Sequence, residues 1–309
     1  MYCAQLTSCF FIMVIAKAKT LFNQPKFLSL KIDYNLNQDV LNKILNYLNE
    51  NRSLFAISLF GEGLFSEAAK EILIRAKEVG LATSIDMTAE ETSINKFKNI
   101  RNIVNQLRIW FELNGDYEYK INYFLELLKK ERFNQKIIII LRGEKIDKDF
   151  IVRISKLINE KYYLSPFIIL NAKHYNEKII IKEFINSCRI ITELHIKNPV
   201  KIFIDNPLCG IINMKAKNFC PAGRISFHLD SNGNIKPCHL VKLSLGNIKT
   251  DKIDTVWKKM MSLHNQSKCL ICKYYRVCGG GCLANKNDIL DKDLLCSYFI
   301  KLNDKIRNK

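Results

Sequence analysis

Seven of the eleven cysteines in this 309-residue chain lie between positions 220 and 296. They are spaced as C-x12-G-x4-C, then C-x2-C-x5-C-x3-C, then a single C. The seven are Cys220, Cys238, Cys269, Cys272, Cys278, Cys282 and Cys296. Bunched thiols of this kind close disulfides, bind zinc or bind iron–sulfur clusters, so their chemistry decides the class of the protein.

The three alternatives differ in how many thiols they use. Disulfide frameworks belong to small secreted domains. Here the apolar run at positions 10–16 is short and no Lys or Arg precedes it, so we expect no secretory signal. Zinc takes four ligands, which the four thiols between positions 269 and 282 could supply, but three cysteines would then have no role. Clusters are typically held by four thiolates each, so seven thiolates predict one complete cluster and one with three protein ligands.

The residues between the cysteines favour clusters over zinc. Glycines occupy all three positions between Cys278 and Cys282, which allows the backbone to wrap closely and turn its N–H groups toward an anion. Between Cys220 and Cys238, apolar and polar residues alternate over positions 225–229, and the sequence DSNGN at positions 230–234 predicts a hairpin turn. The hairpin returns Cys238 to the strand that follows Cys220.

The upstream two-thirds of the chain alternates strand-like and helix-like patterns. The predicted strands cover residues 27–34, 53–59, 81–85, 107–112, 136–141 and 167–170, with a further strand at 199–205. The predicted helices cover residues 38–49, 66–79, 94–104, 116–133 and 147–161. Ser66 is expected to cap the second of these helices, and Gly80 to follow its end. The alternation predicts an α/β fold with a parallel sheet and right-handed crossovers.

Residues 219–296 resemble the SPASM domain that follows the barrel of radical S-adenosylmethionine enzymes. The resemblance implies that Cys269, Cys272, Cys278 and Cys296 hold one auxiliary [4Fe-4S] cluster, called cluster II here. It also implies that Cys220, Cys238 and Cys282 hold another, called cluster I. Some family members have an eighth cysteine, where this chain has Ile225 and Ser226. Cys209 is a candidate for the open ligand position, alongside an ordinary role as a loop thiol.

The upstream region resembles the partial (β/α)6 TIM-like barrel of the same family. The expected domains are therefore a degenerate barrel at residues 1–205 and a SPASM domain at residues 206–309. Gly61, Glu62 and Gly63 follow the second predicted strand and resemble the family's GGEPL loop, which contacts S-adenosylmethionine. Gly63 stands where the family has proline.

The radical-generating motif of the family, C-x3-C-x2-C after the first strand, is missing. No cysteine lies between Cys9 and Cys188. The sequence therefore predicts an iron–sulfur protein that uses auxiliary clusters for peptide binding, electron transfer or recognition of a partner enzyme. The alternative is an active radical S-adenosylmethionine maturase, with a cluster supplied by a partner or assembled on Cys3 and Cys9. Its substrate would be a peptide or protein.

The charge of the chain raises a third class of function. There are 48 Lys and Arg residues against 30 Asp and Glu, giving a net charge of +18 and a pI near 9.4. Such a surplus can favour nucleic acid, but the basic residues are spread along the chain, which favours solvated surfaces. No apolar run approaches the ~20 residues of a membrane-spanning helix. Thiolates and labile clusters predict the reducing cytoplasm.

Overall fold

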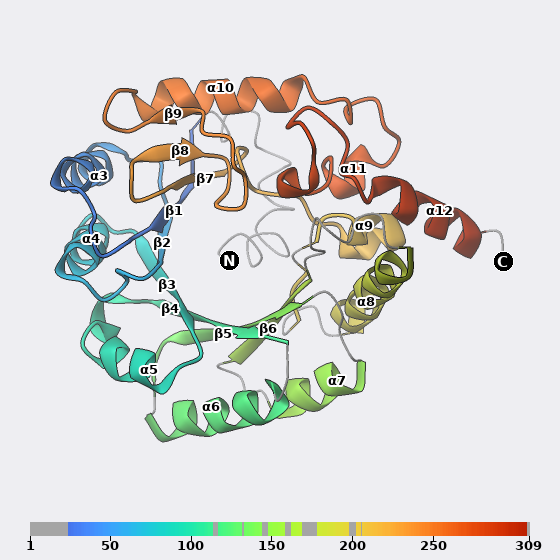
Figure 1. Ribbon diagram of the computed structural model, residues 1–309, viewed down its shortest axis with the longest axis horizontal. Coiled ribbons are helices and arrows are strands. Elements are labelled where there is room, and N and C mark those ends of the chain that lie inside the picture. The colour runs from blue at the N-terminus through green and yellow to red at the C-terminus, as the bar shows by residue number, and fades with distance from the viewer. Residues whose placement is uncertain are drawn as a thin grey trace.

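The computed structural model describes residues 24–113, 117–131, 133–143, 148–157, 162–168, 178–197, 202–204 and 206–307. A nine-stranded, mostly parallel sheet curves through these residues in the order β6-β5-β4-β3-β2-β1-β7-β8-β9, with helices along its outer side (Figure 1). The parallel strands of the first half are β1 (Phe27–Lys31), β2 (Ala56–Phe60), β3 (Ala82–Thr88), β4 (Gln106–Glu112), β5 (Lys136–Gly143) and β6 (Tyr162–Ile168). The predicted α/β class is confirmed.

Helices of the first half follow the strands in turn. They are α3 (Gln38–Glu50), α4 (Glu67–Glu78), α5 (Glu91–Lys98), α6 (Tyr117–Glu131), α7 (Lys148–Leu157) and α8 (Lys178–Lys197), with the 3-10 turn η2 (Arg101–Ile103). Ser66 caps α4 by accepting a hydrogen bond from the Ala69 N–H at 3.3 Å, as predicted. Gly80 follows α4 with φ +81°, a conformation that favours glycine.

Three predictions for residues 147–205 need correction. The sixth strand begins at Tyr162 instead of residue 167, and the preceding helix covers Lys148–Leu157, its predicted end at residue 161 lying outside the described residues. Pro166 interrupts the strand pattern, and the sheet accepts it because β6 is its edge strand. The expected strand at 199–205 is, in its described part, a single bridge from Ile202 to Leu164. Helix α8 was not predicted.

The cysteine-rich part of the chain, from residue 206 onward, adds its strands to the same sheet. Strand β7 (Ser226–Leu229) pairs in parallel with β1, and β8 (Asn234–Lys236) pairs antiparallel with β7. A short strand, β9 (Gly246–Asn247), completes the sheet. The predicted hairpin is confirmed, with φ +85° at Gly233 and the Asp230 carboxylate accepting bonds within the turn. The sheet thus continues across the expected boundary between residues 205 and 206.

The remaining helices pack around this extension of the sheet. They are α9 (Cys209–Ile212), α10 (Ile253–Asn265), α11 (Tyr275–Cys278) and α12 (Cys296–Arg307), with the 3-10 turns η4 (Met214–Ala216) and η5 (Leu283–Asn285). Trp257 anchors α10 to β7, since its buried ring makes an edge contact with Phe227 at 6.3 Å between centroids. Among the described helices, none combines the length and apolar character needed to span a membrane.

Candidate functional site

Four of the predicted ligands gather where α11 meets the start of α12. Cys269, Cys278 and Cys296 are buried, and Cys272 is half-buried. Burial, followed by the charges of Cys278 and Cys272, raises the pKa of the Cys296 thiol to about 12. Burial also raises the pKa of Cys278, with Cys272 and Cys269 adding to the effect. Thiols packed this way ionise together only if a cationic centre compensates them, which is how metal binding couples to deprotonation.

The three glycines between Cys278 and Cys282 form a cradle beside this group. Their φ angles are +57°, +91° and +78°, so the whole run lies in the region that favours glycine. Backbone groups of Gly280 and Gly281 hydrogen-bond the Cys278 sulfur and oppose the rise of its pKa. A Cβ at Gly280 would lie 3.4 Å from the Cys269 Cβ. Backbone donors facing sulfur, in a turn without side chains, fit an anionic cluster.

The other three predicted ligands form a second group. Burial raises the pKa of Cys282 well above its usual range, and the charges of Cys220 and Cys238 add to this. Cys282 follows Cys278 after only the three glycines, so the chain passes directly from one group to the other. The members of each ligand set that the resemblance implied therefore lie close enough to influence one another's pKa. The assignment of ligands to clusters stays a prediction.

Asp293 links the two groups and was missed in the sequence. Its side chain is buried, and its Oδ2 accepts a hydrogen bond from the Cys282 N–H at 2.9 Å. Its Oδ1 accepts a bond from the Leu295 N–H, also at 2.9 Å, one residue before Cys296. Burial raises the pKa of this carboxyl to about 6. Asp293 thus fixes the position of a ligand in each group, although no local motif marks it.

Two further thiols lie beside each other, from α8 and α9. Cys188 and Cys209 are both buried, and the Cys209 Sγ lies 3.8 Å from the Cys188 carbonyl oxygen, to which it donates. Asn206 Nδ2 lies 3.9 Å from the Cys188 Sγ. The candidate fourth ligand Cys209 is thus placed next to Cys188. Cys3 and Cys9 fall outside the described residues.

The disulfide alternative finds no support among the described residues. All nine cysteines in the described ranges are free thiols. Within those same ranges, no three His, Cys, Asp or Glu side chains converge on a point as a single metal ion requires. Zinc needs each sulfur at about 2.3 Å from one ion.

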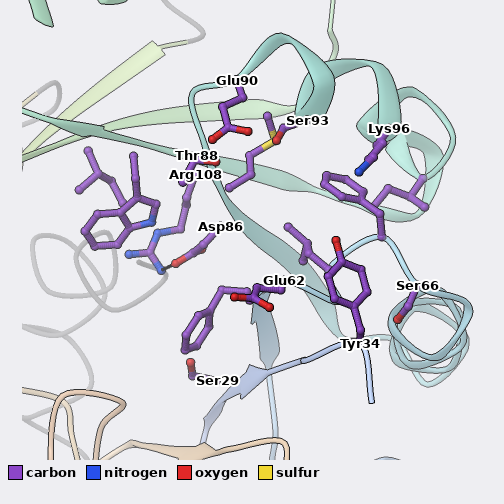
Figure 2. Close-up of a pocket in the computed structure, with 18 of the residues that line it drawn as sticks. Ser29, Tyr34, Glu62, Ser66, Asp86, Thr88, Glu90, Ser93, Lys96 and Arg108 are labelled. Atoms are coloured by element: carbon purple, nitrogen blue, oxygen red, sulfur yellow. Dashed lines mark ion pairs between the residues drawn. The ribbon is translucent and has the colours of Figure 1, made fainter. Parts of the chain in front are cut away.

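A cavity of about 1110 Å³ opens at the C-terminal ends of the parallel strands. Figure 2 shows Tyr34, Glu62 and Asp86 directed into it from the neighbourhood of β1, β2 and β3. Parallel α/β folds place their ligands at this edge of the sheet. His239 and Leu240 also line the cavity. Since His239 directly follows Cys238, with its Nδ1 3.7 Å from that sulfur, the cavity reaches the second thiol group.

An ion pair lies on the inner wall of the cavity. Asp86 and Arg108 are register partners on β3 and β4, and their side chains pair at 3.0 Å with 11% and 17% exposure. Ser58 donates a hydrogen bond to Asp86 at 3.1 Å, and the Arg108 guanidinium lies 5.8 Å from the Trp110 ring. The Arg108 Nε is buried without a partner among the described residues.

His228 lies beneath this wall and is uncharged at neutral pH. The ring is buried and stacks on Phe60 at 5.5 Å between centroids. Burial, then the charge of His239, lowers its pKa to about 3. Its Nδ1 has no hydrogen-bond partner in the part of the chain that the structure describes.

The predicted S-adenosylmethionine loop packs directly on the chain that leaves β1. The Gly63 N–H donates to the Ile32 carbonyl at 2.9 Å, and a Cβ at Gly61 would lie 2.4 Å from that same oxygen. A Cβ at Gly63 would lie 2.6 Å from the Asp33 carbonyl carbon. Glu62 still lines the cavity. A side chain at Gly61 or Gly63 would therefore collide with the backbone that follows β1.

Comparison with known proteins agrees with the cysteine arrangement. Residues 220–282 match SPASM, described as an iron-sulfur cluster-binding domain. The chain is also similar to an AdoMet-dependent heme synthase from Nitratidesulfovibrio vulgaris, with 28% identity over 90 residues. That match covers 26% of this chain and 24% of the relative, so the chain spans about a quarter of the relative's length.

Proposed function

Since this chain carries the SPASM domain of radical S-adenosylmethionine/SPASM proteins, we propose that it is an iron–sulfur electron-transfer protein without a radical-generating cluster of its own. Cluster I is a [4Fe-4S] centre held by Cys220, Cys238 and Cys282. Cluster II is a [4Fe-4S] centre held by Cys269, Cys272, Cys278 and Cys296. The observation that carries the proposal is the gathering of these thiols into two groups joined by the glycine cradle.

The bound clusters supply one-electron redox chemistry, and the protein determines what reaches them. The cavity is the binding site for the substrate, a peptide or protein, or a segment of a partner enzyme. Trp110 and Phe60 offer aromatic contact, and Arg108 and Arg142 add cationic side chains to the lining. A group bound near His239 lies one residue from a ligand of cluster I. The chain acts in the cytoplasm, where thiolates stay reduced.

The absence of a radical-generating cluster is supported by the packing after β1. The connection from Ile32 to the α3 cap Asn37 has no cysteine, and backbone contacts with the Gly61–Gly63 loop fill the space beside it. One relative is named as AdoMet-dependent, so S-adenosylmethionine is the ligand to test. Glu62 is the residue that would contact it from the cavity wall.

We expect no cleavage of S-adenosylmethionine by the protein with its clusters in place. Under reducing, oxygen-free conditions, 5′-deoxyadenosine should stay at the level of a blank without protein, because the chain after β1 has no cysteine to hold a sulfonium-reducing cluster at the Glu62 end of the cavity. The measurement is a single-turnover assay by liquid chromatography and mass spectrometry. Production above the blank would support the alternative, an active maturase with an unusual cluster.

A further inference from the structure

An exposed apolar turn separates two ligands of cluster II. Ile271 is 97% exposed and Leu270 is 44% exposed, and we call these two residues the apolar tip. Ile271 has the highest exposure of any large hydrophobic residue in the described ranges. The turn is held by hydrogen bonds from the Leu270 N–H to the Ser267 carbonyl at 3.1 Å and from the Cys272 N–H to the Cys269 carbonyl at 2.9 Å. A defined backbone therefore presents the tip to solvent.

The tip lies beside the most accessible ligand of cluster II. Cys269, Cys278 and Cys296 are all buried, whereas Cys272, directly after Ile271, is half-buried. A single exposed apolar residue is ordinary on a protein surface. Here the same turn carries both the exposed apolar side chain and the most accessible ligand of cluster II, so a protein bound at the tip would lie next to that ligand.

The surface around the tip is positively charged. Residues 255–287 contain six Lys and Arg residues and no Asp or Glu. Lys273 and Arg276 are exposed and have no ion-pair partner in the part of the chain that is described. On the other side of the turn, Lys268 is compensated by Asp291 at 2.6 Å. The uncompensated charge thus lies on the side that leads into α11.

We propose that the apolar tip, Lys273 and Arg276 form a docking surface for an acidic, one-electron carrier protein. This inference rests on the proposed iron–sulfur function. One electron leaves the flavin or iron–sulfur centre of the carrier, which is oxidised, and enters cluster II, which is reduced; no bond is formed or broken. Redox encounters use small interfaces, and opposite charges steer them together. A small apolar contact ringed by cations fits a transient, acidic partner.

The test is the rate at which a chemically reduced, acidic ferredoxin reduces the clusters, followed by anaerobic stopped-flow absorbance. Ile271→Glu should slow this reduction by about tenfold or more, because a buried contact is lost and a like charge is added. In the unchanged protein, the rate should fall as salt is raised. Reduction by dithionite reports whether the clusters themselves are intact.

Ile179→Glu is the matched control, since Ile179 is 77% exposed on α8 and receives the same chemical change away from the tip. It should leave the ferredoxin rate unchanged. A wild-type ferredoxin rate in Ile271→Glu, or no reduction of the unchanged protein by ferredoxin when dithionite reduces it, overturns the docking surface alone. A protein that binds no iron overturns the proposed function, and this inference with it.

Discussion

Replacing Cys272 with Ala is expected to remove about four of roughly eight bound irons, because each [4Fe-4S] cluster is typically held by four thiolates. The charge of Cys272 helps to raise the pKa values of Cys278 and Cys296, so the three thiols belong to one group. The thiols that raise the pKa of Cys282 are Cys220 and Cys238 instead. Losing Cys272 removes one thiolate from a site built for four, whereas the three-thiolate site of cluster I is unchanged. The measurement is iron and sulfide per protein after anaerobic purification, with paramagnetic resonance spectra of the reduced protein.

Cys188→Ala is the control for this substitution. Cys188 is a buried thiol on α8 whose sulfur lies near Asn206, outside both ligand sets. The control should keep both clusters. If Cys272→Ala keeps all of the iron or loses all of it, the division of the thiols into two sites is wrong.

Gly63→Ala is expected to lower the free energy of unfolding by about 3 kcal/mol, at the upper end for overpacking in a closed space. The added Cβ would lie 2.6 Å from the carbonyl carbon and oxygen of Asp33, and backbone atoms on both sides limit relaxation. Gly63 does not have a positive φ, so the cost would come from the contact itself. Urea unfolding, followed by circular dichroism, measures the change.

Gly80→Ala is the control for Gly63→Ala, because it adds backbone strain without a steric contact. Gly80 has φ +81°, but a Cβ there would meet nothing within 4 Å. The substitution should cost about 1 kcal/mol from the left-handed conformation alone. A loss at Gly63 that is no greater than the loss at Gly80 would show that the Gly61–Gly63 loop does not close on the chain after β1. The packing argument against a radical-generating cluster would then fail.

Local sequence signals predicted those elements that depend on local chemistry. Ser66 and Gly80 mark α4 because a hydroxyl cap and a left-handed glycine act within a few residues. The DSNGN turn marks the β7–β8 hairpin for the same reason. The sequence predicted no strand at residues 162–166, between the predicted helix at 147–161 and the predicted strand at 167–170, and pairing with β5 extends β6 over these residues.

The long-range features of the site could not be predicted in this way. The two groups of thiols were predicted from the spacing of the cysteines and from the resemblance to SPASM domains, because that motif specifies which cysteines share a cluster. Asp293 becomes visible only when folding brings its carboxylate to the Cys282 N–H. The pairing of Asp86 with Arg108 depends on the register between β3 and β4, which no single strand reveals.

The most direct test of the proposed function is the metal content of the protein purified without air, together with acid-labile sulfide and the visible spectrum. We expect about eight irons and a similar amount of sulfide per chain, as two [4Fe-4S] clusters require. One tightly bound zinc without sulfide, or a colourless, iron-free protein even after reconstitution with iron and sulfide, would contradict it.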